Sequence, residues 1–181
     1  MKIFVSRRWA IFFMACLLFV LSQFYRASIA VITPDLIAHL ELDVNDLSLI
    51  SASFFYAFAV MQIPISMYLD AIGPRIAMTA LSLLGVAGAL VFAWGDTVGS
   101  LVAGRLLLGA GTACSLMGTL KLITLWFGPL RFATISALVV SFGTLGNMTA
   151  ATPLVLMVQS IGWRMTFTVF AGINLLLTMM F

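Results

Sequence analysis

Charged side chains are scarce in this sequence: they make up 8% of the residues, against 63% hydrophobic ones. The mean hydropathy is +1.18. A soluble domain needs about 25% charged residues to keep its surface wetted. Because this chain cannot cover itself with polar groups, its outer solvent must be lipid. The sequence therefore predicts an integral membrane protein.

Residues that bind metals or perform nucleophilic chemistry are also few. Cys16 and Cys114 lie inside apolar stretches, which is typical of small buried hydrophobic side chains and not of a disulfide or a metal pair. The single histidine, His39, falls between apolar stretches, and no aspartates are paired within one. Since an intramembrane hydrolase needs a Ser–His or paired-Asp arrangement, we expect no enzyme, no cofactor and no metal site.

The chain is basic, with a net charge of +3 and a pI of about 9.2. Its cations form no cluster with interleaved aromatic residues, as a nucleic-acid surface would require. Most of them flank apolar stretches, where anionic lipid headgroups attract them. We therefore expect a lipid bilayer as partner and no nucleic acid.

Long apolar runs dominate what remains. A membrane-spanning helix needs about 20 apolar residues, at about 1.5 Å each. No run shows the alternating pattern of about 10 residues that marks membrane β-strands. Asp, Gly, Pro and charges fill the breaks between runs. The sequence predicts an all-α, integral membrane bundle of six transmembrane helices in one domain, residues 1–181, with helices at about 9–32, 47–69, 76–94, 98–120, 132–158 and 164–181.

Lysine and arginine collect on one side of this bundle if the helices alternate in direction, which predicts a cytoplasmic N-terminus. The cations on that side are Lys2, Arg7, Arg8, Arg75, Lys121 and Arg131. Between the first two helices, residues 33–46 are expected to form a solvated outer loop. The basic start also resembles a secretory signal, but apolar residues continue to Ile32 and favour a membrane helix.

Arg26 lies about 17 residues into the first apolar run and has no carboxylate beside it. A bare cation in hydrocarbon costs at least about 2.5 kcal/mol, so it is either satisfied by other groups or used. Ser22, Gln23, Arg26 and Thr33 share one helix face. The two interpretations are an arginine that faces a water-filled cavity and binds an anion, and one that extends outward to the headgroups.

Arg105 is a second cation without an acid nearby, about two turns inside the outer end of the fourth run. Arg105 either contacts a ligand or donates hydrogen bonds to the carbonyls of a neighbouring helix and fixes the packing. A guanidinium binds carboxylate or phosphate in a two-pronged fork. An anionic solute, or acids from another part of the assembly, would therefore balance both arginines. Candidate binding residues are Arg26, Tyr25, Gln23, Asn147 and Arg105.

Three short segments resemble signatures of the major facilitator superfamily. Asp70-Ala71-Ile72-Gly73-Pro74-Arg75 resembles the G-x-x-x-D-R-x-G-R-R loop between helices 2 and 3, with Asp70, Gly73 and Arg75 matching and Ser66 and Ala71 departing from it. Residues 104–111 match R-x-x-x-G-x-G of helix 4 at Arg105, Gly109 and Gly111. Gly162-Trp163-Arg164 is similar to the G-W-R that enters helix 6. The resemblance assigns the residues of the first segment to the inner gate and those of the second segment to the packing of helix 4.

Tyr25-Arg26 followed by Pro34-Asp35 resembles helix 1 of the organic-anion branches of this superfamily, in which an arginine contacts substrate phosphate or carboxylate. The resemblance implies secondary active transport of a small anionic solute, such as an organic acid or an amino acid, by alternating access. It also implies a bacterial inner membrane and a proton as coupling ion for symport.

The superfamily has twelve helices in two halves, and this chain resembles the N-terminal half only. We expect a truncated product, a partial chain, or a half that works with a C-terminal half or a second copy. The alternative function is an inactive or regulatory half-transporter, or another membrane protein that transports nothing.

Overall fold

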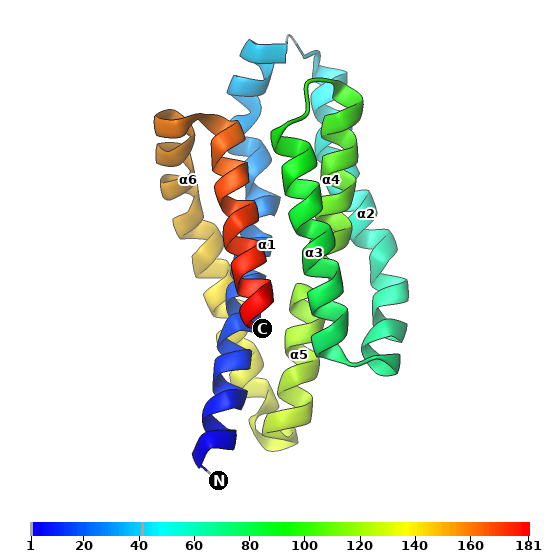
Figure 1. The fold of residues 1–181 in the computed structure, drawn as a ribbon, viewed down its shortest axis with the longest axis vertical. Coiled ribbons are helices and arrows are strands. Elements are labelled where there is room, and N and C mark those ends of the chain that lie inside the picture. Colours follow the sequence, from blue (N-terminus) through cyan, green and yellow to red (C-terminus); the bar gives the residue numbers. More distant parts are fainter. Residues whose placement is uncertain (1, 41) are drawn as a thin grey trace.

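The computed structural model describes the backbone of residues 2–40 and 42–181, and the side chains of these residues except 2–8, 145, 146 and 149–151. Within these ranges the chain is helical and contains no strand, which confirms the predicted all-α fold class (Figure 1). The helices are α1 (Lys2–Leu40), α2 (Val44–Ala71), α3 (Pro74–Ala93), α4 (Val98–Thr112), α5 (Cys114–Phe127) and α6 (Pro129–Met180).

These six elements do not correspond one to one with the six apolar runs. A single turn at Ala113 separates α4 from α5, and the two form one apolar stretch, Val98–Phe127. The long α6 instead contains two stretches that meet at Gly162, whose φ of 79° breaks the helix. Five described stretches are long and apolar enough to cross a membrane, and Pro129–Thr144 is a shorter apolar one.

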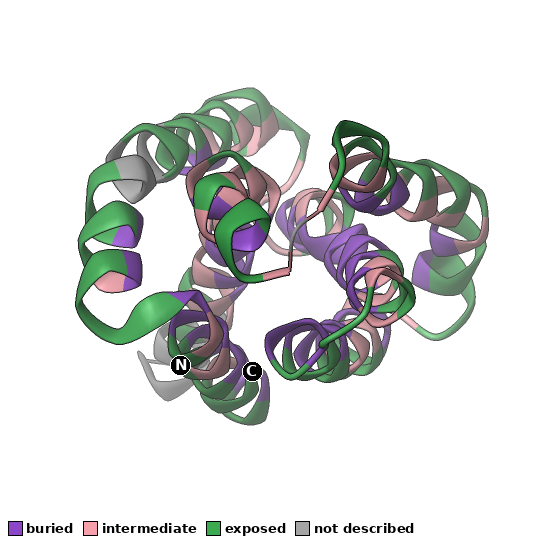
Figure 2. Cartoon of the chain, turned by 90° about the horizontal axis from the view of Figure 1, so that it is seen from above, coloured by how far each residue is buried: buried purple, intermediate pink, exposed green. Residues whose placement is uncertain are grey.

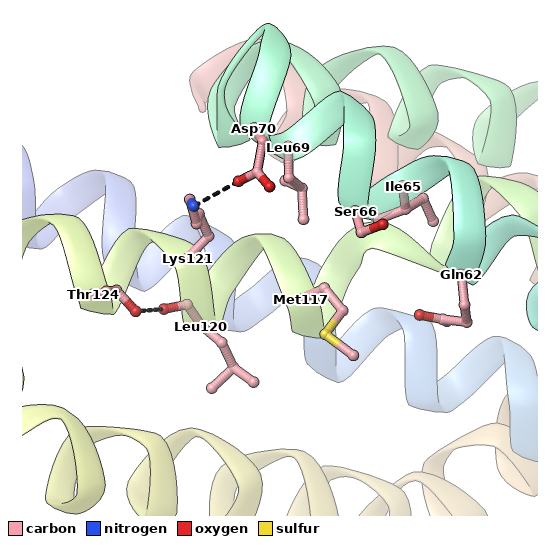
Figure 3. Close-up of a pocket in the computed structure, with 9 residues that line it drawn as sticks. All are labelled: Gln62, Ile65, Ser66, Leu69, Asp70, Met117, Leu120, Lys121 and Thr124. Carbon is pink, nitrogen blue, oxygen red and sulfur yellow. Dashed lines mark hydrogen bonds and ion pairs between the residues drawn. The ribbon is translucent and has the colours of Figure 1, made fainter.

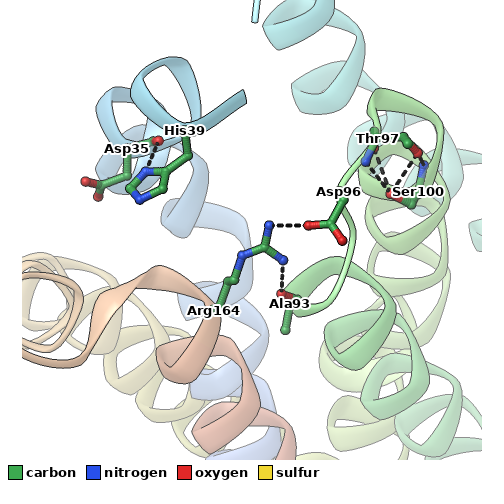
Figure 4. Close-up of polar contacts among 7 residues, drawn as sticks. All are labelled: Asp35, His39, Ala93, Asp96, Thr97, Ser100 and Arg164. Carbon is green, nitrogen blue, oxygen red and sulfur yellow. Dashed lines mark hydrogen bonds and ion pairs between the residues drawn. The ribbon is translucent and has the colours of Figure 1, made fainter. Parts of the chain in front are cut away.

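The first helix is longer than the sequence predicted. Residues 33–40 belong to α1, so the predicted outer loop over residues 33–46 is wrong for its first part. Pro34 is accommodated because Ile32 and Leu36 on either side of it are fully buried in the core. The ring nitrogen of His39 lies 2.9 Å from the Asp35 carbonyl oxygen, four residues back, as in a regular helix turn (Figure 4). The next helix, α2, is capped by the Asp43 carboxylate.

Two sets of helices carry most of the packing: α1 lies against α6, and α4 lies against both α2 and α3. The α3–α6 contact joins the two sets. Viewed from above, the buried residues lie on the helix sides that face one another and the exposed residues lie on the outer sides (Figure 2). The N-terminus, the α2–α3 turn and the α5–α6 turn lie at one end of the bundle (Figure 1).

Glycines let α4 approach its neighbours closely. A side chain on Gly109 would collide with the Phe54 carbonyl oxygen on α2, and one on Gly111 would collide with the Gly85 backbone on α3. Small residues at such spacing are what membrane helices use to bring their backbones together. The Arg-x-x-x-Gly-x-Gly segment of α4 therefore lies where α4 packs closely against α2 and α3.

Candidate functional site

A cavity of about 410 Å³ opens beside Arg26, between α1, α2 and the junction of α4 with α5. Its wall is mostly apolar with a few polar side chains, the usual make-up of a small-molecule site. The lining residues are Phe19, Ser22, Gln23, Arg26, Phe58, Gln62, Thr112, Ala113, Leu116 and Met117. Ser22, Gln23 and Arg26 of the predicted polar face of α1 line this cavity, and Thr33 does not.

Arg26 is half-buried in the cavity wall. Its guanidinium carbon lies 4.6 Å from the centre of the Phe58 ring, so a cation–π contact holds the charge in place. The buried Nε atom has no hydrogen-bond partner among the described residues. A guanidinium is a planar fork of five donors, and here the aromatic contact leaves those donors available for an oxyanion.

Gln23 brings a second unsatisfied polar group to the same wall. Its Oε1 is buried and has no partner in the described part of the chain. Buried polar atoms are rarely left unpaired, so this oxygen can accept a hydrogen bond from a bound molecule. The two orphaned groups of Gln23 and Arg26 line one cavity, three residues apart on one helix.

Arg105 has different surroundings. It is 1% exposed, and its Nη1 donates a 2.9 Å hydrogen bond to the carbonyl oxygen of Tyr25. The rings of Phe54 and Phe92 lie 5.4 and 5.5 Å from its guanidinium carbon. Because the carbonyl belongs to the residue before Arg26, the two arginines lie at similar depth. Arg105 therefore joins α4 to α1 inside the core and does not line the Arg26 cavity.

Two other predicted binding residues also lie outside this cavity. Tyr25 is 1% exposed, and its ring packs against Phe167 and Phe170 of α6. Tyr25 packs in the core, whereas its neighbour in sequence, Arg26, lines the cavity. Asn147 is exposed on α6 and is not among the residues that line the cavity. The structure brings Arg26 and Gln23 together and leaves Tyr25, Arg105 and Asn147 elsewhere.

A second cavity of about 250 Å³ adjoins the first, and Gln62 and Met117 line both (Figure 3). Here Lys121 on α5 donates a 2.7 Å hydrogen bond to the Asp70 carboxylate on α2. The pair is open to solvent, with the two side chains 38% and 70% exposed. The sequence located both residues at the inner end but did not predict that they pair.

The rest of the predicted gate motif has separate partners. Gly73 adopts a φ of 83° just before Pro74, a conformation that glycine adopts without strain. Arg75 donates through Nη2 to the Phe181 carbonyl oxygen at 2.6 Å, which joins α3 to the end of α6. Asp70 and Arg75 thus contact different helices and not each other.

At the opposite end of the bundle a second ion pair joins Arg164 to Asp96 at 2.7 Å (Figure 4). Arg164 also donates to the Ala93 carbonyl oxygen at 3.0 Å, and its guanidinium lies 4.6 Å from the centre of the Trp163 ring. Trp163 itself is buried against Phe92. The Gly162-Trp163-Arg164 segment therefore fixes the start of the last stretch of α6 to the α3–α4 turn.

Over the described side chains, these two are the ion pairs of the structure. Neither Arg26 nor Arg105 has a carboxylate partner there, as the positions of the acids in the sequence predicted. The positive charge at the cavity wall is therefore balanced by no acid of this part of the chain.

Sequence reasoning did not find Phe58, Thr112 or Ala113 as neighbours of Arg26. They come from helices far from α1 in sequence, and periodicity reports only contacts within a helix. Gln62 was a polar residue in an apolar run, which is the one signal that pointed to it.

The sequence is similar to a known protein family and to two known transporters. The family model of the Major Facilitator Superfamily matches residues 11–181. The chain is 28% identical to the uncharacterized transporter YybO of Bacillus subtilis over 178 residues, which is 96% of this chain and 40% of that protein. It is 25% identical over 181 residues to the probable sulfoacetate transporter SauU of Cupriavidus necator, all of this chain and 42% of that protein. The chain thus spans about two fifths of the length of these relatives.

Proposed function

Because the chain belongs to the Major Facilitator Superfamily, we propose that it forms the N-terminal half of a secondary transporter that carries a small organic anion by alternating access. Its partners are the bilayer and a C-terminal half, or a second copy, that closes the cavity from the other side. We assign it to the inner membrane of a bacterium, with the N-terminus in the cytoplasm, since lysines and arginines collect at that end.

The observation that carries this proposal is the guanidinium of Arg26 at the wall of the 410 Å³ cavity, without a carboxylate partner among the described residues. A permanent positive charge in such a place is unfavourable in free energy unless a ligand of opposite charge stabilises it. Gln23, with its orphaned amide oxygen, would receive a hydrogen bond from a hydroxyl or amine of the solute. Arg26 and Gln23 are therefore the proposed binding pair.

Arg105, Tyr25 and Asn147 take other parts in this proposal. Arg105 holds the backbone of α1 at Tyr25, directly beside Arg26, and so positions the binding residue without touching the solute. Tyr25 anchors the same turn in the core. Asn147, exposed on α6, would contact the solute only when a second half packs against that face.

The name of one relative narrows the chemistry of the solute. Sulfoacetate, the compound in the name of SauU, carries a carboxylate and a sulfonate on one carbon, and both groups fit the donor fork of an arginine. We propose a small carboxylate or sulfonate as cargo. Proton coupling would need a titratable carboxylate in the pathway. No acid is among the residues that line the Arg26 cavity, so a coupling group would come from another part of the pathway.

Uptake into proteoliposomes tests the proposal. The chain, expressed with the C-terminal half of the transporter, should accumulate labelled sulfoacetate or a related small carboxylate. Arg26→Ala should abolish this uptake while leaving the protein folded, and Arg26→Lys should restore little, because an ammonium lacks the two-pronged geometry. Unchanged uptake by Arg26→Ala would refute the assignment.

Two controls separate the site from the scaffold. Arg164→Ala removes an arginine from the outer end of the bundle and should leave the affinity for the solute unchanged, since Arg164 has its own acid partner. The chain reconstituted without a C-terminal half should not transport. Uptake by the 181-residue chain alone would show that it acts as a complete transporter, through a second copy.

A further inference from the structure

The Lys121–Asp70 pair lies at the wall of a second cavity (Figure 3), which adjoins the Arg26 cavity at two shared lining residues. Gln62 on α2 and Met117 on α5 line both cavities, so the two cavities follow one another along these two helices. Eight residues separate Gln62 from Asp70, which is about 12 Å of helix, and Lys121 lies a similar distance from Ala113. A two-carbon anion is much shorter than this span of helix, so we treat Arg26 and Lys121 as successive sites.

The two ion pairs of the described structure are built differently, although both measure 2.7 Å. At the outer end, Arg164 has three contacts: the Asp96 carboxylate, the Ala93 carbonyl and the Trp163 ring. At the inner end, Lys121 donates one hydrogen bond among the described residues, to Asp70. An ammonium has three donors, and exposed ion pairs contribute little net stability. The inner pair can therefore open without dismantling its surroundings.

From this contrast we infer that Lys121 is a second anion site, at which the solute displaces Asp70 on its way between the Arg26 cavity and the inner end of the bundle. The inference deepens the proposed function and rests on it for the identity of the cargo as a small carboxylate or sulfonate. Asp70 acts as a resident counter-ion: it neutralises Lys121 when no solute is present and competes with the solute when one arrives.

The displacement has a structural consequence, because the pair is also a contact between α2 and α5. When a solute oxyanion takes Lys121, Asp70 loses its partner and α2 is released from α5 at the inner end. Solute occupancy and the separation of these two helices are thus linked through one lysine. Outside the pair, the polar groups that line this cavity are Gln62, Ser66 and Thr124.

Lysine labelling can test the site directly, because the sequence contains two lysines only, Lys2 and Lys121. The chain is expressed with the C-terminal half, placed in lipid nanodiscs and treated with an amine-reactive ester, and the acylation of Lys121 is followed by mass spectrometry. Sulfoacetate is the probe, and sodium chloride keeps the ionic strength equal in every sample. Asp70→Asn should accelerate acylation of Lys121 by about two- to fivefold, the range that an exposed ion pair allows.

Added sulfoacetate should then slow the acylation of Lys121 in Asp70→Asn, while glycerol, a neutral solute of similar size, should not. Asp70→Ser should behave in the same way and serves as a second variant if the asparagine protein is poorly folded. The matched control is Asp96→Asn, which opens the outer pair and should leave both the rate and the protection of Lys121 unchanged. Failure of sulfoacetate to protect Lys121 in both Asp70 variants would overturn the inference.

Arg26→Ala distinguishes this inference from the proposed function. Since about 12 Å of α2 separates Gln62, beside Arg26, from Asp70, the partner of Lys121, protection of Lys121 should persist in the Arg26→Ala, Asp70→Asn double variant although uptake is lost. Loss of protection only when Arg26 is removed would show that the solute never contacts Lys121, and would overturn the inner site while leaving the Arg26 site intact. Uptake that survives Arg26→Ala refutes the proposed function itself.

Discussion

Gly109 offers the sharpest test of how this bundle is held together. In Gly109→Ala, the added methyl group would meet the Phe54 carbonyl oxygen and the backbone carbon atoms next to it. A backbone carbonyl cannot rotate away as a side chain can, so α2 and α4 must separate locally. Overpacking of this kind costs about 1–3 kcal/mol, and here the upper part of the range applies because the contact is with backbone.

Gly99→Ala is the matched control on the same helix. A methyl group at Gly99 meets nothing within 4 Å, so this variant keeps only the gain of about 0.5–1 kcal/mol that alanine has over glycine in a helix. The same gain offsets part of the cost at Gly109. The two variants should therefore differ by about 2–3 kcal/mol, which corresponds to roughly 4–12 °C in Tm for a chain of this length.

The measurement is the thermal unfolding of both variants in the same detergent, followed by tryptophan fluorescence. Gly109→Ala should melt below the wild type and Gly99→Ala at or slightly above it. Equal melting temperatures for the two alanine variants would contradict the close approach of α2 and α4.

Three further predictions concern the turn, the outer pair and the cavity. Gly73→Ala should lower the stability by about 1–2 kcal/mol because an L-residue is strained at a φ of 83°, whereas Gly172→Ala, at a helical position with free space, should not; equal Tm values would count against the strained turn. Arg164→Ala should lower Tm more than Asp96→Asn, since it removes the Ala93 and Trp163 contacts as well as the ion pair, and equal losses would mean that the ion pair alone matters. Phe58→Leu should weaken solute binding by about two- to fivefold, the value of one exposed cation–π contact, with little change in Tm; an unchanged Kd would mean that the ring does not position Arg26.

The sequence was a good guide to the helices because their determinants are local. Gly73 and Gly128, each followed by proline, end one helix and begin the next, and long apolar stretches fill the space between. Pro34 misled for a related reason. A proline disfavours a helix by itself, but burial of Leu36 against other helices overrides that preference, and no local pattern reports such burial.

For the candidate site, the sequence identified Arg26 and Gln23 through their spacing on one helix. It left two interpretations open for Arg105, and the structure shows a hydrogen bond from Arg105 to the Tyr25 carbonyl that links α4 to α1. The pairing of Lys121 with Asp70 spans 51 residues, and sequence spacing contains no information on such a partner. The sequence predicted only that these two charges lie at the same end of the bundle.

The account depends on Arg26 being a binding site for anions, and an equilibrium titration tests this most directly. Sulfoacetate, titrated calorimetrically into the chain assembled with its C-terminal half, should bind the wild type and Arg164→Ala with similar Kd. It should bind Arg26→Ala at least about tenfold more weakly, the loss of one charge-assisted hydrogen-bonded contact. Equal affinity of the wild type and Arg26→Ala for sulfoacetate, with both proteins folded, would contradict the central claim.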